Sequence, residues 1–423
     1  MQLKRHHSSL NDIIPDDILV SIFHAIVNRE FADQAQASDW ERQRHQFLCT
    51  MDLIQITHVC RRWRYVSVND PRLWSHILWK RPKWSAEMLL RCKGLPITID
   101  QTIDNHPSIA DMREILSHLP RTRALRLSGR QNVCRAFDKE LSQPAPMLQS
   151  ATLIGLEKAY YFWDDESSIV PSNLFAGNAP YLRRLVISRY TLSWKAPIIS
   201  GLRHLEVRMD NPYPYRTISD YRDRMIPLTS TNDILDALEQ AHELQTLILA
   251  FTLPYIPDNK PLRSIDRIIR MPRLSQLILQ GYMRDCADFA GHLAIHPNAR
   301  LQYHCLYAGN GEDSSDLALR LLQPCHASIT SKPMDVFYAH HELRFFDLKA
   351  VERMSQSPTF DLMLDQGPLR GPDSETRNAC LLAALQILRS QFVRRAEEHI
   401  PAIHVPRPLN SVILSTYSTP AIA

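Results

Sequence analysis

The stretch PYLRRLVI at residues 180–187 decides the fold of most of this chain, because it recurs. PRLSQLIL (272–279) repeats it closely, whereas HELQTLIL (242–249) and HELRFFDL (341–348) keep its apolar positions behind other leading residues. Weaker copies lie at 120–127, 146–153, 200–207 and 407–414, and a poor one, NARLQYHC, lies at 298–305. The sixth and eighth positions of the copies are apolar and two residues apart, which predicts a strand with one face in the core.

Stretches with helical periodicity separate several copies, at 108–119, 232–241, 263–270, 285–296 and 315–322. An earlier strand is predicted around Ile97 and Ile99. This alternation resembles the leucine-rich repeat, in which stacked units bury a core that no single unit can form. The expected fold is α/β, with an irregular leucine-rich-repeat-like solenoid over residues 81–423 and a C-terminal helix at 374–400 as its cap. The alternative is an ordinary α/β domain in which the motif arises by chance.

The N-terminal segment has helical rather than strand periodicity. Apolar residues recur four and five positions apart in IPDDILVSIFHAIV (14–27), and two acidic residues follow its proline, as suits the positive end of a helix dipole. A second apolar stripe runs from Leu53 to Val66, and Asp70 and Pro71 predict the N-cap and first position of a third helix. Three short helices are either a cap on the larger domain or a unit that keeps an apolar face for a partner.

Together these segments closely resemble the F-box, through IIPDDILVSIF at 13–23, VCRRWR at 59–64 and PRLW at 71–74. The resemblance places an F-box at residues 8–80, with the polar stretch 28–50 as an insertion similar to those of large fungal F-box families. F-box proteins dock on the Skp-type adaptor of cullin-based ubiquitin ligases and present a substrate through the domain that follows. The resemblance therefore implies a substrate-receptor subunit. The alternative is an interaction scaffold that binds the adaptor without ubiquitylation.

The resemblance also implies which residues contact the adaptor. They are Ile14, Pro15, Ile18, Leu19, Ile22 and Phe23 in the first helix, and Val59, Cys60, Trp63, Leu73 and Trp74 in the second half. Some of these are expected to be internal core instead, and the two tryptophans favour that interpretation. A cullin would join through the adaptor, and apolar burial suffices for such an interface, so no catalytic residue is expected.

An unidentified protein substrate is expected on the open face of the predicted strands, where period-two alternation sends the remaining side chains. The candidate residues are Arg126, Arg184, His204, Glu206, Arg208, Gln276 and Gln280. The first half of this face is mildly basic, which would steer acidic or phosphorylated targets toward it. The alternatives are a solvated face without a ligand, and binding at the Pro/Tyr-rich loop 212–224.

Composition and motifs argue against several other classes of protein. Only 11 of 423 residues are glycine, and phosphate-loop and nucleophile-elbow motifs are missing, so an enzyme and a cofactor are not expected. A net charge of +4 is too small to predict nucleic-acid binding, and no apolar stretch is long enough to predict a membrane span. The eight cysteines lack zinc-ligand spacing, and His292 and His296 lack the glutamate of a zinc motif, so no metal is expected. A protein of the cytoplasm and/or nucleus with reduced thiols is predicted.

Overall fold

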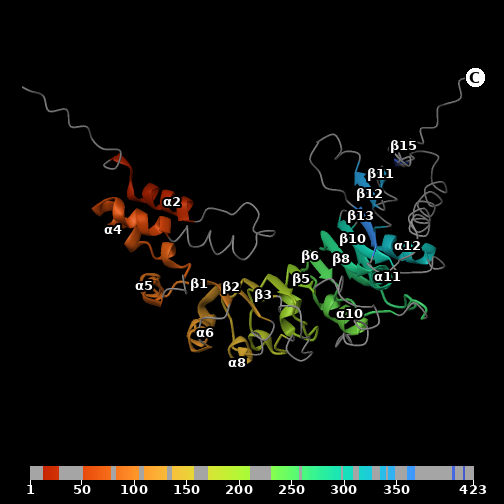
Figure 1. The fold of residues 1–423 in the computed structure, drawn as a ribbon, viewed down its shortest axis with the longest axis horizontal. Coiled ribbons are helices and arrows are strands. Elements are labelled where there is room, and N and C mark those ends of the chain that lie inside the picture. The colour runs from red at the N-terminus through yellow and green to blue at the C-terminus, as the bar shows by residue number, and fades with distance from the viewer. Residues whose placement is uncertain are drawn as a thin grey trace, which may run out of the picture.

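The computed structural model shows a helical N-terminal region followed by a region built on a large sheet (Figure 1). It describes residues 13–27, 51–77, 82–103, 109–130, 136–156, 170–209, 230–256, 260–296, 299–307 and 314–325, and beyond these only the backbone of five strands between 334 and 414. The predicted insertion 28–50, the loop 212–224 and the C-terminal helix 374–400 lie outside the described residues.

Short helices with tight caps make up the N-terminal region. They are α2 (Asp16–Val27), a helix at 51–59, α4 (Arg61–Asn69), the 3-10 helix η1 (Pro71–Trp74) and α5 (Pro82–Arg91). The second apolar stripe is broken at Cys60, whose backbone is extended and whose Sγ accepts a hydrogen bond from the N–H of Trp63 at 3.4 Å. As predicted, Asp70 caps η1 and Pro71 is its first residue.

The rest of the described fold is organised by a sheet of thirteen strands. Eight of them are parallel neighbours in chain order: β1 (Ile97–Ile103), β2 (Thr122–Arg130), β3 (Ser150–Leu156), β4 (Arg184–Ser188), β5 (His204–Arg208), β6 (Thr246–Ala250), β8 (Gln276–Tyr282) and β10 (Arg300–Tyr307). The order continues with β13 (Phe360–Gln366), β12 (Glu342–Asp347), β11 (Met334–Ala339), β14 (Ile403–His404) and β15 (Ile413–Leu414). Parallel strands that follow one another in chain order are expected when the chain repeats a unit of one strand and one connection.

Three copies of the motif behave differently from the prediction. The poor copy at 298–305 is a full member of the parallel run, because β10 pairs with β8 over seven residues. The copy at 341–348 forms β12, which is antiparallel to both β11 and β13, so it is not a further unit of the run. Of the copy at 407–414, the structure describes only Ile413 and Leu414.

A hydrogen-bonded turn recurs before the strands and explains the first leucine of the motif. The N–H of this leucine donates to the carbonyl three residues earlier, at 3.0 to 3.2 Å, in Leu148, Leu182, Leu202, Leu244 and Leu274. All five leucines are buried. The following residue then donates to the preceding unit, as from Arg183 to the carbonyl of Gln149 at 2.9 Å and from Arg203 to that of Arg183 at 2.8 Å. This main-chain ladder connects the units although the motif lacks a following asparagine.

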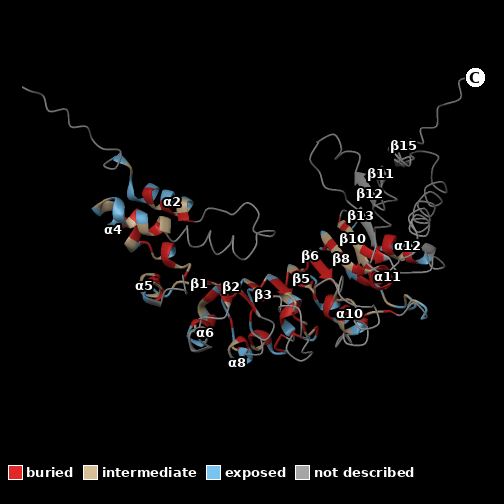
Figure 2. Cartoon of the chain, viewed as in Figure 1, coloured by how far each residue is buried: buried red, intermediate tan, exposed pale blue. Residues whose placement is uncertain are grey.

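The core lies on one face of the sheet, in two rows of side chains that the register aligns. One row consists of Ile99, Leu125, Ala151, Leu185, Leu205, Leu247, Leu277 and Leu301. None of these side chains is more than 2% exposed. From Leu125 to Leu277 they are the sixth residues of six copies, which confirms that this position faces inward, whereas Leu301 is the fourth residue of the copy at 298–305, whose predicted register is two residues off. Figure 2 shows that buried residues follow the strands and the surfaces that the helices cover.

Helical elements cover this core face. The sheet is curved, and the helices lie on its convex side (Figure 1). They are α6 (Ile109–Leu116), η2 (Leu119–Arg121), α8 (Asp138–Leu141), η3 (Leu174–Gly177), η4 (Pro197–Gly201), α10 (Thr231–Gln240), α11 (Met283–Gly291), α12 (Ser314–Leu322) and η5 (Gln323–Cys325). Four of the five predicted covering helices are therefore present, as α6, α10, α11 and α12.

The predicted helix at 263–270 does not form. The chain there is irregular up to β7 (Ile269–Met271), which pairs with β9 (Leu293–Ile295) in a second, small sheet. Two buried carboxylates of α11 bind the backbone at and before the start of this stretch instead. Asp285 accepts a hydrogen bond from the N–H of Ile256 at 2.8 Å, and Asp288 accepts one from the N–H of Arg263 at 3.0 Å. These tertiary hydrogen bonds replace the ones that a helix would make.

Candidate functional site

Several residues that were predicted to contact an adaptor are instead buried between the N-terminal helices. Leu19 and Phe23 of α2 are 0% exposed, and Leu73 and Trp74 of η1 are nearly as buried. The ring of Phe23 lies 5.0 Å from that of Trp63 at a tilt of 57°. The indole N–H of Trp74 donates to the Ser67 carbonyl at 2.9 Å. These side chains hold the helices together, so in the free chain they do not form an open surface.

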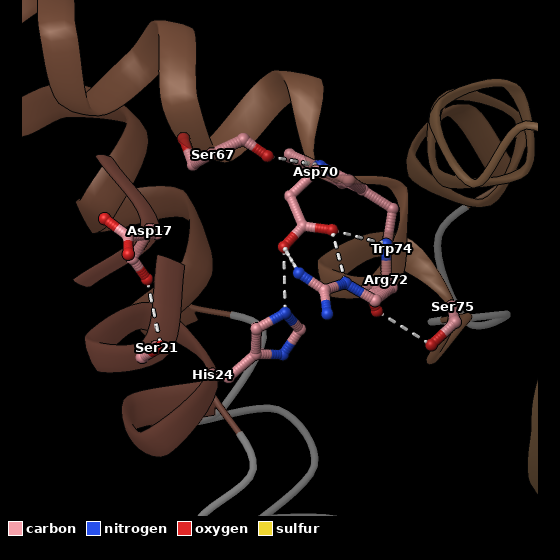
Figure 3. Close-up of polar contacts among 8 residues, drawn as sticks. All are labelled: Asp17, Ser21, His24, Ser67, Asp70, Arg72, Trp74 and Ser75. Atoms are coloured by element: carbon pink, nitrogen blue, oxygen red, sulfur yellow. Dashed lines mark hydrogen bonds and ion pairs between the residues drawn. The ribbon is translucent and has the colours of Figure 1, made fainter. Parts of the chain in front are cut away.

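Asp70 is the polar centre of this region (Figure 3). Its carboxylate accepts hydrogen bonds from the backbone N–H, Nε and Nη2 of Arg72, at 3.0 to 3.1 Å, and lies 2.9 Å from Nε2 of His24. Burial raises the pKa of the Asp70 carboxyl, but the hydrogen bonds from Arg72 and His24 outweigh it and hold the pKa below its ordinary value. One carboxylate thus fixes α2, the end of α4 and the start of η1 relative to each other.

Other predicted contact residues remain on the surface. Ile18, Ile22 and Val59 are 47%, 37% and 54% exposed, and Pro15 is also exposed. Ile18 and Ile22 are one turn apart on α2, so they share a face of that helix. Ile14, Cys60 and Trp63 are half-buried.

An arginine brings the start of α2 close to the start of α4. The Nη2 atom of Arg62 donates to the Ile14 carbonyl and to Oδ1 of Asp16, both at 2.6 Å. Val59 precedes Arg62 by three residues, at the end of the helix 51–59. Pro15 and Val59 each lie within three residues of this contact in the chain.

The helical region is joined to the sheet by direct contacts as well as by the chain. The N–H of Thr98 in β1 donates to the Ser75 carbonyl at 2.9 Å, and His76 forms a parallel bridge with Thr98. The guanidinium of Arg91 in α5 lies 4.2 Å from the centre of the Trp74 ring, a cation–π contact. The segment after η1 thus continues the edge of the sheet.

The second candidate surface is the sheet face that carries no helix. Three outward rows run along it in register: the first holds Arg184, His204 and Gln276, the second Arg126 and Glu206, and the third Arg208 and Gln280. Every predicted substrate residue therefore lies on one face. In the described strands β1 to β10, these rows carry four arginines, at 126, 184, 208 and 300, against Asp100 and Glu206, a net charge of +2 with neutral histidines.

Ion pairs reduce the positive charge on this face. The Nε of Arg126 lies 3.7 Å from Oδ1 of Asp100, a residue that the sequence interpretation did not include. Glu206 accepts a hydrogen bond from Nε of Arg208 at 2.5 Å, and its Oε2 lies 3.3 Å from Nε2 of His204 and 3.9 Å from Nη2 of Arg184. Burial alone would raise the pKa of Glu206, but the hydrogen bonds with His204 and Arg208 lower it to about 2.

Other residues singled out in the sequence have structural roles. α11 ends at Gly291, so His292 and His296 do not share a helix face, and Nδ1 of His292 lies 2.9 Å from the Arg267 carbonyl. Within the described ranges, no group of three or more His, Cys, Asp or Glu residues could hold a metal ion. The same part of the chain contains no helix of the length and apolarity that crossing a bilayer requires.

Comparison with known proteins adds one finding. The family model described as F-box-like matches residues 12–80, which contain the helical region up to η1 and its junction with β1. This match confirms the F-box-like character of the N-terminal region and indicates an adaptor-binding role. No curated protein matches the sequence significantly.

Proposed function

We propose that this chain is the substrate-receptor subunit of a Skp–cullin–F-box ubiquitin ligase. The observation that carries the proposal is the exposed apolar surface of the F-box-like region, defined by Pro15, Ile18, Ile22 and Val59. Isoleucine and valine side chains about half exposed on a small helical unit favour burial against a partner, at about 25 cal/mol per Å² of apolar area. The buried residues Leu19, Phe23, Leu73 and Trp74 support this surface from beneath.

In this proposal the sheet region acts as a leucine-rich-repeat-like solenoid that holds the substrate on its helix-free face. The recurring turn, the main-chain ladder and the parallel run from β1 to β10 support that interpretation. The contacts of Ser75 and His76 with Thr98 support a fixed orientation between the adaptor surface and the substrate face. Such an orientation suits transfer of ubiquitin by other subunits, with no catalytic residue or cofactor in this chain, in the cytoplasm and/or nucleus.

The first experiment tests adaptor binding. Ile18→Asp combined with Ile22→Asp should abolish capture by a purified Skp-type adaptor, because it places two charges in an apolar interface. The matched control is Leu90→Asp with Met147→Asp, which changes two exposed apolar residues outside the F-box-like region. Equal capture of both double variants would contradict the proposed surface.

The second experiment separates the receptor from the scaffold alternative. Purified cullin should join the complex of the chain with the adaptor, and proteins bound to the chain should acquire ubiquitin when the remaining ligase components are added. A stable complex with the adaptor that excludes the cullin would instead identify a scaffold without ubiquitylation.

A further inference from the structure

A group of charged residues on the helix-free face has the features of a binding site. It consists of Arg184 on β4 and His204, Glu206 and Arg208 on β5, here called the Glu206 cluster. The register places Arg184 opposite His204, and Ser188 opposite Arg208, so the four side chains emerge from two neighbouring strands on one face. The cluster is far in sequence from the F-box-like region and takes no part in its packing.

The cluster already binds a carboxylate, its own. The Glu206 side chain is only 15% exposed, and two basic residues of the same strand lie within 3.3 Å of its oxygens. These contacts hold the Glu206 carboxylate ionised well below its ordinary pKa. The donors are thus arranged with the spacing that a carboxylate group requires.

Donors remain beyond those that Glu206 can use. A guanidinium carries five N–H donors in a planar fork, so the two arginines offer more than one carboxylate can accept. Arg184 and Arg208 are 46% and 36% exposed, and Arg184 reaches Glu206 only at 3.9 Å. With a neutral imidazole, the cluster has a net charge of +1.

We propose that the Glu206 cluster binds carboxylate side chains of an acidic, extended segment of a partner protein, and that Glu206 competes for the same donors in the free chain. Complementary charge identifies the partner, since the three outward rows carry +2 and continue through Gln276 and Gln280 to Arg300 and His304. From β1 to β10 the face spans about 33 Å, the length of about ten extended residues. This inference rests on the proposed function only where it identifies the acidic segment as part of the substrate.

The test measures binding of a fluorescent Glu/Gly peptide of about ten residues to the purified full chain by anisotropy. Arg184→Ser with Arg208→Ser should weaken binding about tenfold or more, as expected for loss of charged hydrogen bonds. Lys195→Ser with Arg273→Ser is the matched control, because it removes the same charge from exposed residues outside the three rows. Glu206→Gln should tighten binding severalfold at neutral pH, since it removes the competing carboxylate.

Each outcome decides the proposal. The proposal would be overturned if a Gln/Gly peptide bound as well as the Glu/Gly peptide. It would also be overturned if the arginine variant and its control bound the Glu/Gly peptide equally, or if Glu206→Gln bound it more weakly. A phosphoserine peptide or an RNA of equal charge that binds tenfold tighter would also overturn it, by reassigning the ligand. If the arginine variant melts early, charge reversal provides the second test: Arg184→Glu with Arg208→Glu should then prefer a Lys/Gly peptide.

The measurement needs no adaptor, so it fails or succeeds independently of the proposed ligase role. Peptide binding without adaptor capture would leave the Glu206 cluster as a site and remove the ligase assignment. Adaptor capture without peptide binding would do the reverse.

Discussion

The Nε2 atom of His24 lies 2.9 Å from Oδ2 of Asp70, so the last turn of α2 is tied to the residue that ends α4 and caps η1. This contact joins residues 46 positions apart. A surface formed by Ile18 and Ile22 on α2 and by Val59 before α4 depends on the relative position of these helices. The geometry of the proposed adaptor surface is therefore controlled by a polar contact that lies outside it.

Asp70→Asn should destabilise the F-box-like region by about 2 kcal/mol, because it weakens the η1 cap and the hydrogen bonds from Arg72 and His24. Hydrogen exchange of peptides covering residues 61–77 should accelerate, while Asp17→Asn, at an exposed position of α2, should have little effect. The pKa of Asp70 is lowered by folding, so its contribution is present above the ordinary aspartate pKa and is lost as pH falls through the folded value. Unchanged exchange in Asp70→Asn would contradict the role of this carboxylate.

Phe23→Ala and Ile22→Ala should separate folding from adaptor binding at adjacent positions. Phe23 is 0% exposed and packs on Trp63, so its truncation should lower the unfolding free energy by about 3–5 kcal/mol. Ile22 is 37% exposed, so its truncation should cost less than about 1 kcal/mol and instead weaken adaptor capture. Denaturant unfolding and capture by the adaptor measure the two effects, and equal losses of stability would refute the assignment.

Glu206 should make the stability of the sheet region depend on pH. Its pKa falls from 4.5 to about 2 on folding, so its stabilisation is complete above pH 4.5 and is lost as the pH approaches 2. The shift corresponds to at most about 3–4 kcal/mol, because one pKa unit is about 1.4 kcal/mol. Glu206→Gln should flatten the pH dependence of the unfolding free energy between pH 5 and pH 3, and an unchanged slope would show that the carboxylate is not held as described.

Local patterns predicted the elements whose residues interact mainly with their own unit. The leucine of the recurring turn and the apolar residues two positions apart are themselves core residues, so the parallel strands were predictable. The helical periodicity of apolar residues made α6, α10, α11 and α12 predictable as well. The break at Cys60 was not predictable from the apolar stripe, because the stripe continues through this residue. A new helix begins there because Sγ of Cys60 accepts a hydrogen bond from the N–H of Trp63.

Pairings between distant residues limited the prediction of the site. The division of the F-box residues into core and surface depends on how η1 packs on α2, which places Leu19 and Phe23 inside and leaves Ile18 and Ile22 outside. The charge of the sheet face likewise depends on Asp100, which β1 places beside Arg126. The misassigned helix at 263–270 depends on such a pairing too, since Asp288 of α11 accepts a hydrogen bond from the Arg263 N–H, 25 residues away in the chain.

The last prediction concerns that irregular segment. Asp285 and Asp288 of α11 are buried and accept hydrogen bonds from the backbone of Ile256 and Arg263, and the Nη1 of Arg320 donates to the Arg263 carbonyl at 2.7 Å. Asp288→Ala would leave the Arg263 N–H without its acceptor and would remove a carboxylate 3.8 Å from the guanidinium groups of Arg263 and Arg320, at a cost of about 2–4 kcal/mol. Because residues 261–268 belong to no helix or strand, trypsin should cleave Asp288→Ala at Arg263 before the rest of the chain. Asp266→Ala is the control, since that exposed carboxylate accepts a hydrogen bond from the nearby hydroxyl of Ser264 and its loss should leave cleavage unchanged. Equal cleavage of the two variants would show that α11 does not hold the segment in place.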